Sequence, residues 1–290
     1  MKHAYLIIAH QEFEILNYLL ASLDDQRNNI FVHIDKKVND VPKLSCSAAK
    51  LVVLEERIDV RWADVSQIEV ELLLFKTAYH YAEHAYYHLL SGVDMPLRSQ
   101  DYIHAFFEKH RGKEFVGFTQ AEISKQLERK VKRFHLFPRH FRRENSFLGF
   151  TRRFLRSIFL KFQEVTGVYR NRAIDFKKGT NWVSVTHAFV GYLLTYEAQI
   201  MQTYQHTFCA DEIFLHTLCW HSDFRDCIYD FQSEGRGSQR VIRWKDNQIC
   251  DWKNGEFEEL VNTSFIFARK FNSKNMELVR QVICYVTKVR

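Results

Sequence analysis

The chain has 290 residues, of which 46% are hydrophobic, and it carries a formal net charge of +6 at pH 7. This composition supports a substantial hydrophobic core in one large domain or two modest ones. No run approaches the roughly 18 apolar residues that a transmembrane helix needs, and the first residues do not form a signal peptide. The cysteines show no CxxC or CxxH spacing, so we expect reduced thiols, no zinc site and a cytoplasmic protein.

The first third of the chain alternates between strand and helix patterns. Short apolar runs predict buried strands, and apolar residues at helical spacing predict helices over residues 12–24 and 66–85. A strand, a helix and a second strand in succession form a βαβ unit, for which a parallel sheet is expected. The predicted strands cover residues 4–9, 29–35, 50–56, 87–92 and 114–118. We therefore predict an α/β fold with an open, mostly parallel sheet flanked by helices.

Polar residues stand at the ends of three of these strands. They are His10, Asp35 and Asp94. Ligands of open parallel sheets bind beyond the carboxyl ends of the strands, so these residues are candidates for a binding site. No Gly-rich loop follows the first strand, which leaves dinucleotide and P-loop binding unsupported. The grouping favours a nucleotide-sized ligand.

A basic segment interrupts the alternation between about residues 120 and 175. From residue 125 to 161, twelve Lys and Arg residues stand against Glu128 and Glu144, and seven phenylalanines are interleaved with them. Such a stretch can bind the anionic surface of a membrane or nucleic acid, or it can form a solvated face with its phenylalanines turned inward. Nucleic acid is the weakest of the three, because no nucleic-acid-binding motif is present. We interpret the segment as an insertion or lid within a single domain of residues 1–290.

Strands and helices resume after the insertion. Residues 177–186 predict a turn and then an alternating strand with Trp182 on one face, followed by a helix from about residue 187. The later predicted elements are strands at 239–244 and 267–271, a helix at 257–261 and a terminal helix from about residue 274.

The pair Asp211-Glu212 lies where an irregular stretch gives way to a predicted helix. A carboxylate on the first helical turn lies near the positive end of the helix dipole, which lowers its pKa and keeps it ionised. Such a group suits a general base. Acidic residues also occur at helix starts simply because they cap the helix and match its dipole. The pair alone leaves both interpretations open.

Four cations near the C-terminal end complete a set of candidate site residues: Arg240, Arg243, Arg269 and Lys270. A nucleotide-sugar transferase needs an acid for the nucleoside, a base for the acceptor hydroxyl and positive charge for the departing diphosphate. The sequence contains no D-x-D motif, which many such enzymes use to hold a divalent metal. An Arg/Lys pair can replace that metal electrostatically. Each cation taken singly is more often a surface residue.

Eight blocks of the sequence, in order, carry a resemblance to a known family. They are AYLIIAHQEFEILNYLLASL, FVHIDKK, WADVS, HLLSGVDMPLRS, GTNWVSVTHAFVGYLL, ADEIFLHTL, RVIRW and FARKF. In these blocks the chain resembles the core-2/I-branching β-1,6-N-acetylglucosaminyltransferases, a family that includes the peptide O-xylosyltransferases. The resemblance implies a GT-A-type glycosyltransferase fold. It also implies inverting, metal-independent transfer from a UDP-sugar to a hydroxyl group of a glycan.

The resemblance also implies roles for individual residues. Glu212 matches the catalytic base, while Asp211 keeps the ordinary role of a helix-start residue. Lys270 matches the lysine that contacts the diphosphate. Arg240 is the first match for that lysine's arginine partner, and Arg243 is the alternative if the alignment slips.

The remaining matches lie at the two ends of the expected site. His10 and Asp35 match the nucleoside end, and Asp94 and Trp182 fall where the donor sugar and acceptor should meet. No cofactor or metal is expected besides the UDP-sugar substrate.

The chain departs from the animal members of the family in three ways. It has no membrane anchor, its cysteines suggest no disulfide framework, and the basic segment replaces the middle of the chain. Acceptor identity therefore stays open between a glycan and a lipid-linked glycan. Surface polysaccharide or glycoconjugate synthesis is expected, in the cytoplasm or on the inner face of the membrane, with residues 125–161 as the possible contact with an anionic membrane surface. N-acetylglucosamine is the expected sugar, with xylose as the rival. A non-catalytic UDP-sugar or glycan-binding protein is the alternative outside enzymes.

Overall fold

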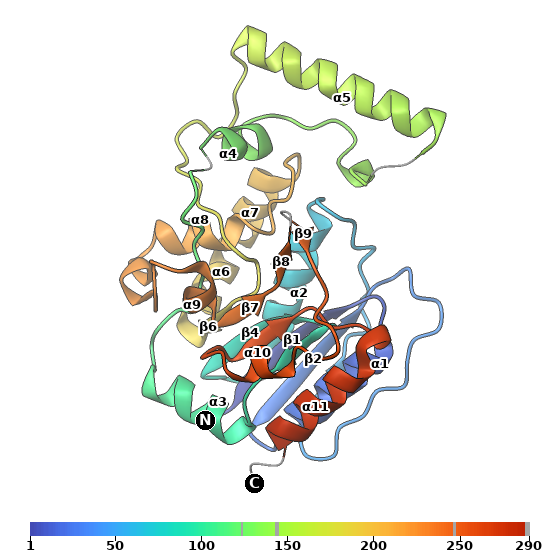
Figure 1. Cartoon of the computed structure of the whole chain (residues 1–290). Helices are drawn as coiled ribbons and strands as arrows, with labels where there is room; N and C mark the ends of the chain where they lie inside the picture. The colour runs from blue at the N-terminus through green and yellow to red at the C-terminus, as the bar shows by residue number, and fades with distance from the viewer. Residues whose placement is uncertain (123, 143–144, 246–247, 288–290) are drawn as a thin grey trace.

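A five-stranded sheet forms the centre of the computed structural model, which describes residues 1–122, 124–142, 145–245 and 248–287 (Figure 1). The strands lie in the order β3-β2-β1-β4-β6. The first four are parallel, and β6 pairs antiparallel to β4. Their bounds are β1 His3–Ala9, β2 Asn28–Ile34, β3 Lys50–Val53, β4 Tyr86–Ser91 and β6 Ser184–Thr186. The predicted mostly parallel α/β sheet of GT-A type is confirmed.

Helices cover both faces of this sheet because alternate side chains of each strand point to opposite sides. In β1, Ala4 and Leu6 join one buried cluster, and Tyr5 and Ile7 join the other. The first cluster packs under α2 Ser66–Tyr81, α6 His187–Thr195, α7 Glu197–Tyr204 and α8 Phe214–Trp220. The second packs under α1 Phe13–Leu23, α3 Gln100–Lys109 and α11 Met276–Thr287.

A smaller sheet, with strand order β5-β10-β7, lies beside the first. Its strands are β5 Asp94–Pro96, β10 Phe267–Arg269 and β7 Arg240–Ile242. Strand β10 pairs antiparallel to β5 and parallel to β7, so Arg269 lies opposite Asp94. The remaining short elements of this half are β8 Trp244–Lys245, β9 Gln248–Ile249, α9 Glu234–Ser238, α10 Phe257–Val261 and the 3-10 helices η2 Asp223–Cys227 and η3 Ser273–Asn275.

The basic segment projects from the rest of the protein, at the top of Figure 1. It contains α4 Ser124–Val131, the 3-10 helix η1 Pro138–His140 and α5 Phe147–Thr166. Its two ends meet, because the Thr119 N–H donates to the Lys178 carbonyl at 3.0 Å. Within the described ranges, no helix combines the length and apolar character needed to cross a membrane.

Gly117 and Gly179 make this meeting of backbones possible. Phe118 and Gly179 form an isolated antiparallel bridge. A Cβ atom on Gly179 would lie 1.7 Å from the Gly117 carbonyl oxygen, and one on Gly117 would lie 2.1 Å from the Glu234 carbonyl oxygen. Only glycine fits where backbones approach this closely.

Several predicted elements differ from the structure. Residues 114–118 make isolated bridges instead of a strand, because Gly117 packs against the backbone of Glu234. In 177–186 only residues 184–186 are a strand, and β3 ends at residue 53. Helix α8 begins at Phe214, so Asp211 and Glu212 lie in the turn before it. Strand β5 and helix α3 were not predicted. All six cysteines are free thiols, as expected.

Candidate functional site

The ends of β1 and β2 hold the first two predicted site residues. The Asp35 N–H donates to the Ala9 carbonyl at 2.9 Å, which places Asp35 beside the end of β1, where His10 follows. Asp35 is buried and accepts hydrogen bonds from the N–H and the Nζ of Lys37, each at 2.8 Å. Desolvation lowers the pKa of His10, and the Asp35 carboxylate opposes that shift. The structure therefore brings His10 and Asp35 together.

Arg269 contacts both Asp94 and Trp182. The Ser91 hydroxyl and N–H donate to the Asp94 carboxylate at 2.6 and 2.9 Å, which fixes its orientation. The Arg269 Nε lies 3.7 Å from Asp94 Oδ1, and the Arg269 guanidinium carbon lies 4.1 Å from the centre of the Trp182 ring. Burial lowers the pKa of Arg269, and Asp94 opposes the shift. Arg269 was one of the four candidate cations in the sequence, but no individual role was predicted for it.

Lys270 and Arg243 lie at one corner of the smaller sheet. The Lys270 Nζ is 3.6 Å from Asp251 Oδ1, and Arg243 donates to the Asp251 carbonyl at 3.1 Å. A second nitrogen of Arg243 forms an ion pair with Glu256. Both cations are partly exposed, so they can reach a bound anion. Lys270 and Arg243 therefore share a neighbour, Asp251. Arg243 was the alternative match for the arginine partner of the diphosphate-binding lysine.

Arg240 is placed differently from the position expected for a diphosphate ligand. Its side chain is buried and donates to the Val183 carbonyl at 2.8 Å and to the Ser184 hydroxyl at 3.0 Å. Further hydrogen bonds go to the carbonyls of Leu89 and Ser238. Burial lowers the pKa of Arg240 to about 9. Because the first residue of β7 points into the seam between the two sheets, Arg240 lies inside the protein and not on the wall of the site.

Glu212 lies between two lysines. Its Oε2 is 3.1 Å from the Nζ of Lys178 and 3.5 Å from the Nζ of Lys130, and its carbonyl accepts the Gly179 N–H at 3.0 Å. Its side chain is 36% exposed, enough for a substrate to reach the carboxylate. Lys178 belongs to the segment that continues to Trp182, whereas Lys130 comes from α4 of the insertion. Neither lysine was predicted as a site residue. The only signal for them in the sequence is that each lies in a run of basic residues.

Asp211 is buried behind Glu212 and accepts a hydrogen bond from Gln67 Nε2 at 2.8 Å. Burial, followed by the negative charge of Glu212, raises the pKa of Asp211 to about 7. The expected helix-dipole effect on this pair, a lowered pKa, is therefore wrong for Asp211. The residue precedes the cap position Ile213, and desolvation dominates its environment. Burial likewise raises the pKa of its neighbour Glu71.

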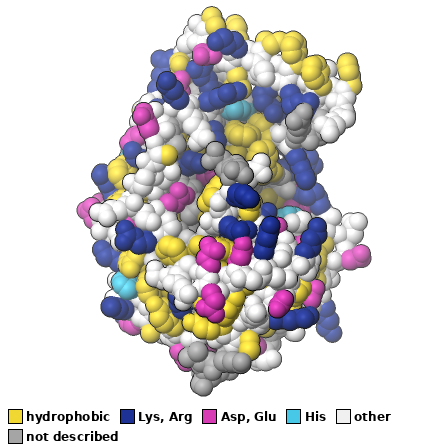
Figure 2. Space-filling view, in the orientation of Figure 1, with side chains coloured by type: hydrophobic (Ala, Val, Ile, Leu, Met, Phe, Trp, Pro, Cys, Tyr) yellow, Lys and Arg dark blue, Asp and Glu magenta, His cyan; other side chains and the backbone are white. Residues whose placement is uncertain are grey.

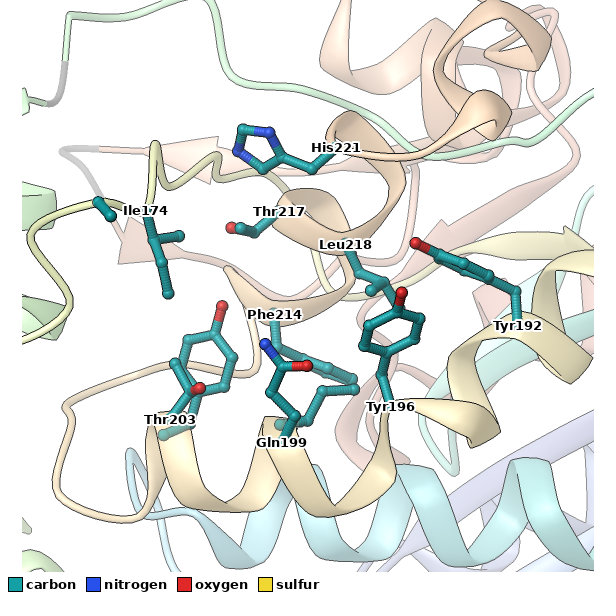
Figure 3. Close-up of a pocket in the computed structure, with 12 residues that line it drawn as sticks. Ile174, Tyr192, Tyr196, Gln199, Thr203, Phe214, Thr217, Leu218 and His221 are labelled. Carbon is teal, nitrogen blue, oxygen red and sulfur yellow. The ribbon is translucent and has the colours of Figure 1, made fainter.

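Two other properties bear on what the site can bind. Within the described ranges, no group of three or more His, Cys, Asp or Glu residues is placed to hold a metal ion. A cavity of about 290 Å³ lies beside α8, where Tyr192, Tyr196 and Gln199 face Phe214 and Thr217 (Figure 3). None of the predicted site residues lines this cavity.

Comparisons with known proteins cover almost the whole chain. The sequence model of the Core-2/I-Branching enzyme family matches residues 3–273. Xylosyltransferase 2 of Canis lupus familiaris is 23% identical over 311 residues, which cover 97% of this chain and 33% of the relative. Xylosyltransferase 2 of Bos taurus is 24% identical over 309 residues, with 98% and 33% covered. The chain therefore spans about a third of the length of these curated relatives.

Replacing Arg240 should destabilise the fold. Arg240→Met removes the buried hydrogen bonds to the Val183 and Ser238 carbonyls and to the Ser184 hydroxyl, so we expect the free energy of unfolding to fall by about 2–4 kcal/mol. Arg243→Met breaks a partly exposed ion pair and should cost less than about 1 kcal/mol. Urea unfolding followed by circular dichroism measures both. Equal stability of the two variants would show that Arg240 does not join the sheets as described.

Asp211→Asn should change how stability depends on pH. The Asp211 carboxyl ordinarily has a pKa of 3.8 and has one of about 7 in the folded protein. Between these values the folded protein keeps a proton that the unfolded chain has released, so wild-type stability falls as pH rises. Relative to wild type, the Asn variant should gain up to about 4 kcal/mol between pH 4 and 7.

Urea unfolding at several pH values from 4 to 8 measures this difference. The exposed Asp40 provides the control, because Asp40→Asn removes a carboxylate that is not enclosed. A pH-independent difference between wild type and Asp211→Asn would contradict the prediction.

Proposed function

Because the chain belongs to the Core-2/I-branching enzyme family, as its sequence resemblance predicted, we propose that it is a glycosyltransferase. In this proposal it moves a sugar from a UDP-sugar to a hydroxyl group of a glycan acceptor. The observation that carries the proposal is the placement of residues 178–182. Lys178 contacts Glu212, and Trp182 stacks with Arg269 beside Asp94, so one short segment links the candidate base to the strand-end acid.

Glu212 acts as the general base. It takes the proton from the acceptor hydroxyl as that oxygen attacks the anomeric carbon of the donor sugar. The new carbon–oxygen bond forms opposite the bond to the diphosphate, which breaks, and the anomeric configuration inverts. The ammonium groups of Lys130 and Lys178 orient the carboxylate until the acceptor arrives.

Arg243 and Lys270 stabilise the departing UDP. Their positive charge lies where the diphosphate gains negative charge as the sugar leaves, so they lower the barrier without a metal ion. The contact that both make with Asp251 keeps them together. Arg240 holds the start of β7 against β4 and β6 and takes no direct part in binding the diphosphate. His10 and Asp35 bind the nucleoside, and Asp94, with Arg269 and Trp182, binds the donor sugar near the acceptor.

N-acetylglucosamine is the donor sugar that we favour, with xylose as the rival. The first follows from the branching enzymes of the family, and the name of the xylosyltransferase relatives supports the second. These sugars differ by a few atoms, so a donor screen that detects UDP release is the direct way to separate them. The acceptor would belong to a surface polysaccharide or glycoconjugate.

The protein would work on the inner face of a membrane. Helix α5 of the insertion places most of its phenylalanines on the outside, contrary to the inward-facing alternative. Basic residues of the same segment add electrostatic attraction to anionic lipids. Nucleic acid is not part of the proposal.

Replacing Glu212 tests the role of the base. Glu212→Gln keeps the size of the side chain but cannot take a proton, so turnover should fall about 10²–10⁴-fold. UDP binding should change little, because the cations that Glu212 contacts are Lys130 and Lys178, and not the predicted diphosphate cations. The measurements are UDP release in a donor and acceptor screen and calorimetric titration with UDP.

Glu197→Gln is the control, since Glu197 forms an exposed ion pair with Lys76. Normal turnover by Glu212→Gln would remove Glu212 from the role of base. Wild-type protein that binds a UDP-sugar and never releases UDP would support the non-catalytic binding protein instead.

Chelation tests the metal-free mechanism. Transfer should continue in EDTA at an unchanged rate, because Arg243 and Lys270 supply the positive charge that a metal would otherwise provide. The rate of UDP release is compared with and without EDTA, and then after manganese is added. A loss of activity that manganese restores would contradict the prediction.

A further inference from the structure

A cavity of about 410 Å³ lies inside the insertion, between α4 and α5. Arg129 and Lys130 of α4 and Arg156 of α5 line it, together with the ring of Phe208. None of the described residues that line it is acidic. Arg156 is held by the carbonyls of Leu136 and His140, each at 3.0 Å. Several cations thus surround one space, and burial lowers the pKa of Arg156.

His135 forms a buried part of the wall of the same cavity. The side chain is 6% exposed, and its Nε2 lies 2.9 Å from the Arg129 carbonyl, to which it donates. Burial lowers the pKa of His135 to about 4, so the ring is neutral at pH 7 and its Nδ1 can only accept. Among the described residues, Nδ1 has no hydrogen-bond partner. Nδ1 has almost no accessible surface, so His135 contributes a buried part of the wall, and the cations make the ligand contacts of the cavity.

The cavity lies next to the candidate base. Lys130 forms part of its wall and also contacts the Glu212 carboxylate at 3.5 Å. The ammonium group of Lys130 lies 5.8 Å from the centre of the Phe208 ring, which lines the cavity as well. A molecule bound in the cavity would therefore be separated from Glu212 by the side chain of Lys130.

Helix α5 is amphipathic. Its polar face packs against the rest of the protein, and its apolar face is exposed. Gln163 is buried, and its amide exchanges hydrogen bonds with the backbone of Phe134 at 2.8 and 2.9 Å. On the opposite face, Phe147, Phe150, Phe154 and Phe162 are between 56% and 85% exposed. Figure 2 shows apolar side chains along the upper edge, where α5 lies in Figure 1, with Lys and Arg side chains just below them.

Four aliphatic side chains extend this exposed face: Leu148, Leu155, Ile158 and Val165. Ile158 and Val165 lie four and three residues from Phe162, on the same side of the helix. Leu148 and Leu155 are seven residues apart and widen this face along one edge. A large exposed apolar face bordered by basic residues is typical of a helix that lies in the plane of a membrane surface. An anionic bilayer matches both its apolar and its charged parts.

We propose that the cavity binds the phosphate of a lipid-linked glycan acceptor, whose lipid chain lies in the bilayer against the apolar face of α5. The inference rests on the proposed function, since it names the acceptor of the same reaction. The order of features from the outside inward is apolar helix face, cationic cavity and Glu212. The acceptor would present its lipid, its phosphate and its sugar hydroxyl in that order.

Binding of farnesyl phosphate to the full chain, measured by equilibrium dialysis, tests the cavity. Wild-type protein should bind farnesyl phosphate. Inorganic phosphate and the neutral detergent dodecyl maltoside should each displace it only weakly. Arg129→Gln should weaken binding about tenfold, the effect of losing one charge-assisted hydrogen bond. Lys161→Gln removes a charge from α5 outside the cavity and should leave binding unchanged.

Flotation with vesicles tests the helix face. Wild-type protein should float with phosphatidylcholine vesicles that contain phosphatidylglycerol, and Phe150→Ser/Phe154→Ser should reduce the bound fraction severalfold. Val41→Ser, at an exposed position outside the insertion, is the control. Flotation without affinity for farnesyl phosphate would show that the segment binds membrane lipids only, which overturns the acceptor assignment.

Other results would also overturn the proposal. One is equal affinity of the wild-type protein for farnesyl phosphate and dodecyl maltoside. Another is an equal loss of affinity for farnesyl phosphate in Arg129→Gln and in Lys161→Gln. If inorganic phosphate competes as well as farnesyl phosphate, the site binds free phosphate. Absence of UDP binding and UDP release with every donor would refute the proposed function alone, because the dialysis result does not depend on turnover.

Discussion

The buried guanidinium of Arg240 joins the two sheets on which the site depends. Its hydrogen bonds reach the carbonyl of Leu89 in β4, the hydroxyl of Ser184 in β6 and the carbonyl of Ser238 just before β7. A buried charge costs less when its donors have partners, so these hydrogen bonds favour keeping the groups together, although Arg240 Nε has no partner among the described residues. Arg240 also lies 4.9 Å from the ring centre of Phe267 in β10, which pairs with β7 and places Arg269 opposite Asp94. A cation that is enclosed by protein thus determines where the ligand-facing residues lie.

The other half of the site depends on close backbone contact. Gly117 and Gly179 lack side chains, so residue 179 can donate to the Glu212 carbonyl while Lys178 reaches the Glu212 carboxylate. The turn that holds Glu212 needs no help from the dipole of α8, because two lysines and a backbone hydrogen bond position it. Local electrostatics and steric fit therefore replace the secondary-structure effect that the sequence suggested.

Sequence reasoning predicted the elements whose pattern is local. Strands β1 and β2 and helix α1 follow from apolar periodicity, and the strand-end positions of Asp35 and Asp94 follow from topology. It could not predict burial that distant segments create. An arginine in RVIRW resembles a surface residue until β4 and β6 enclose it, and Asp211 resembles a helix cap until Gln67 covers it. The contact of Lys130 with Glu212 joins residues far apart in the sequence, which no periodicity reports.

The insertion begins and ends at one hydrogen bond, between Thr119 and Lys178. Any segment that closes the same two ends can take its place, and the entropy of closing a loop grows only slowly with its length. One contiguous module, which carries the proposed acceptor surface, can therefore be exchanged without altering the two sheets. The same geometry makes the pair of ends a natural splice point for building chimaeras between relatives.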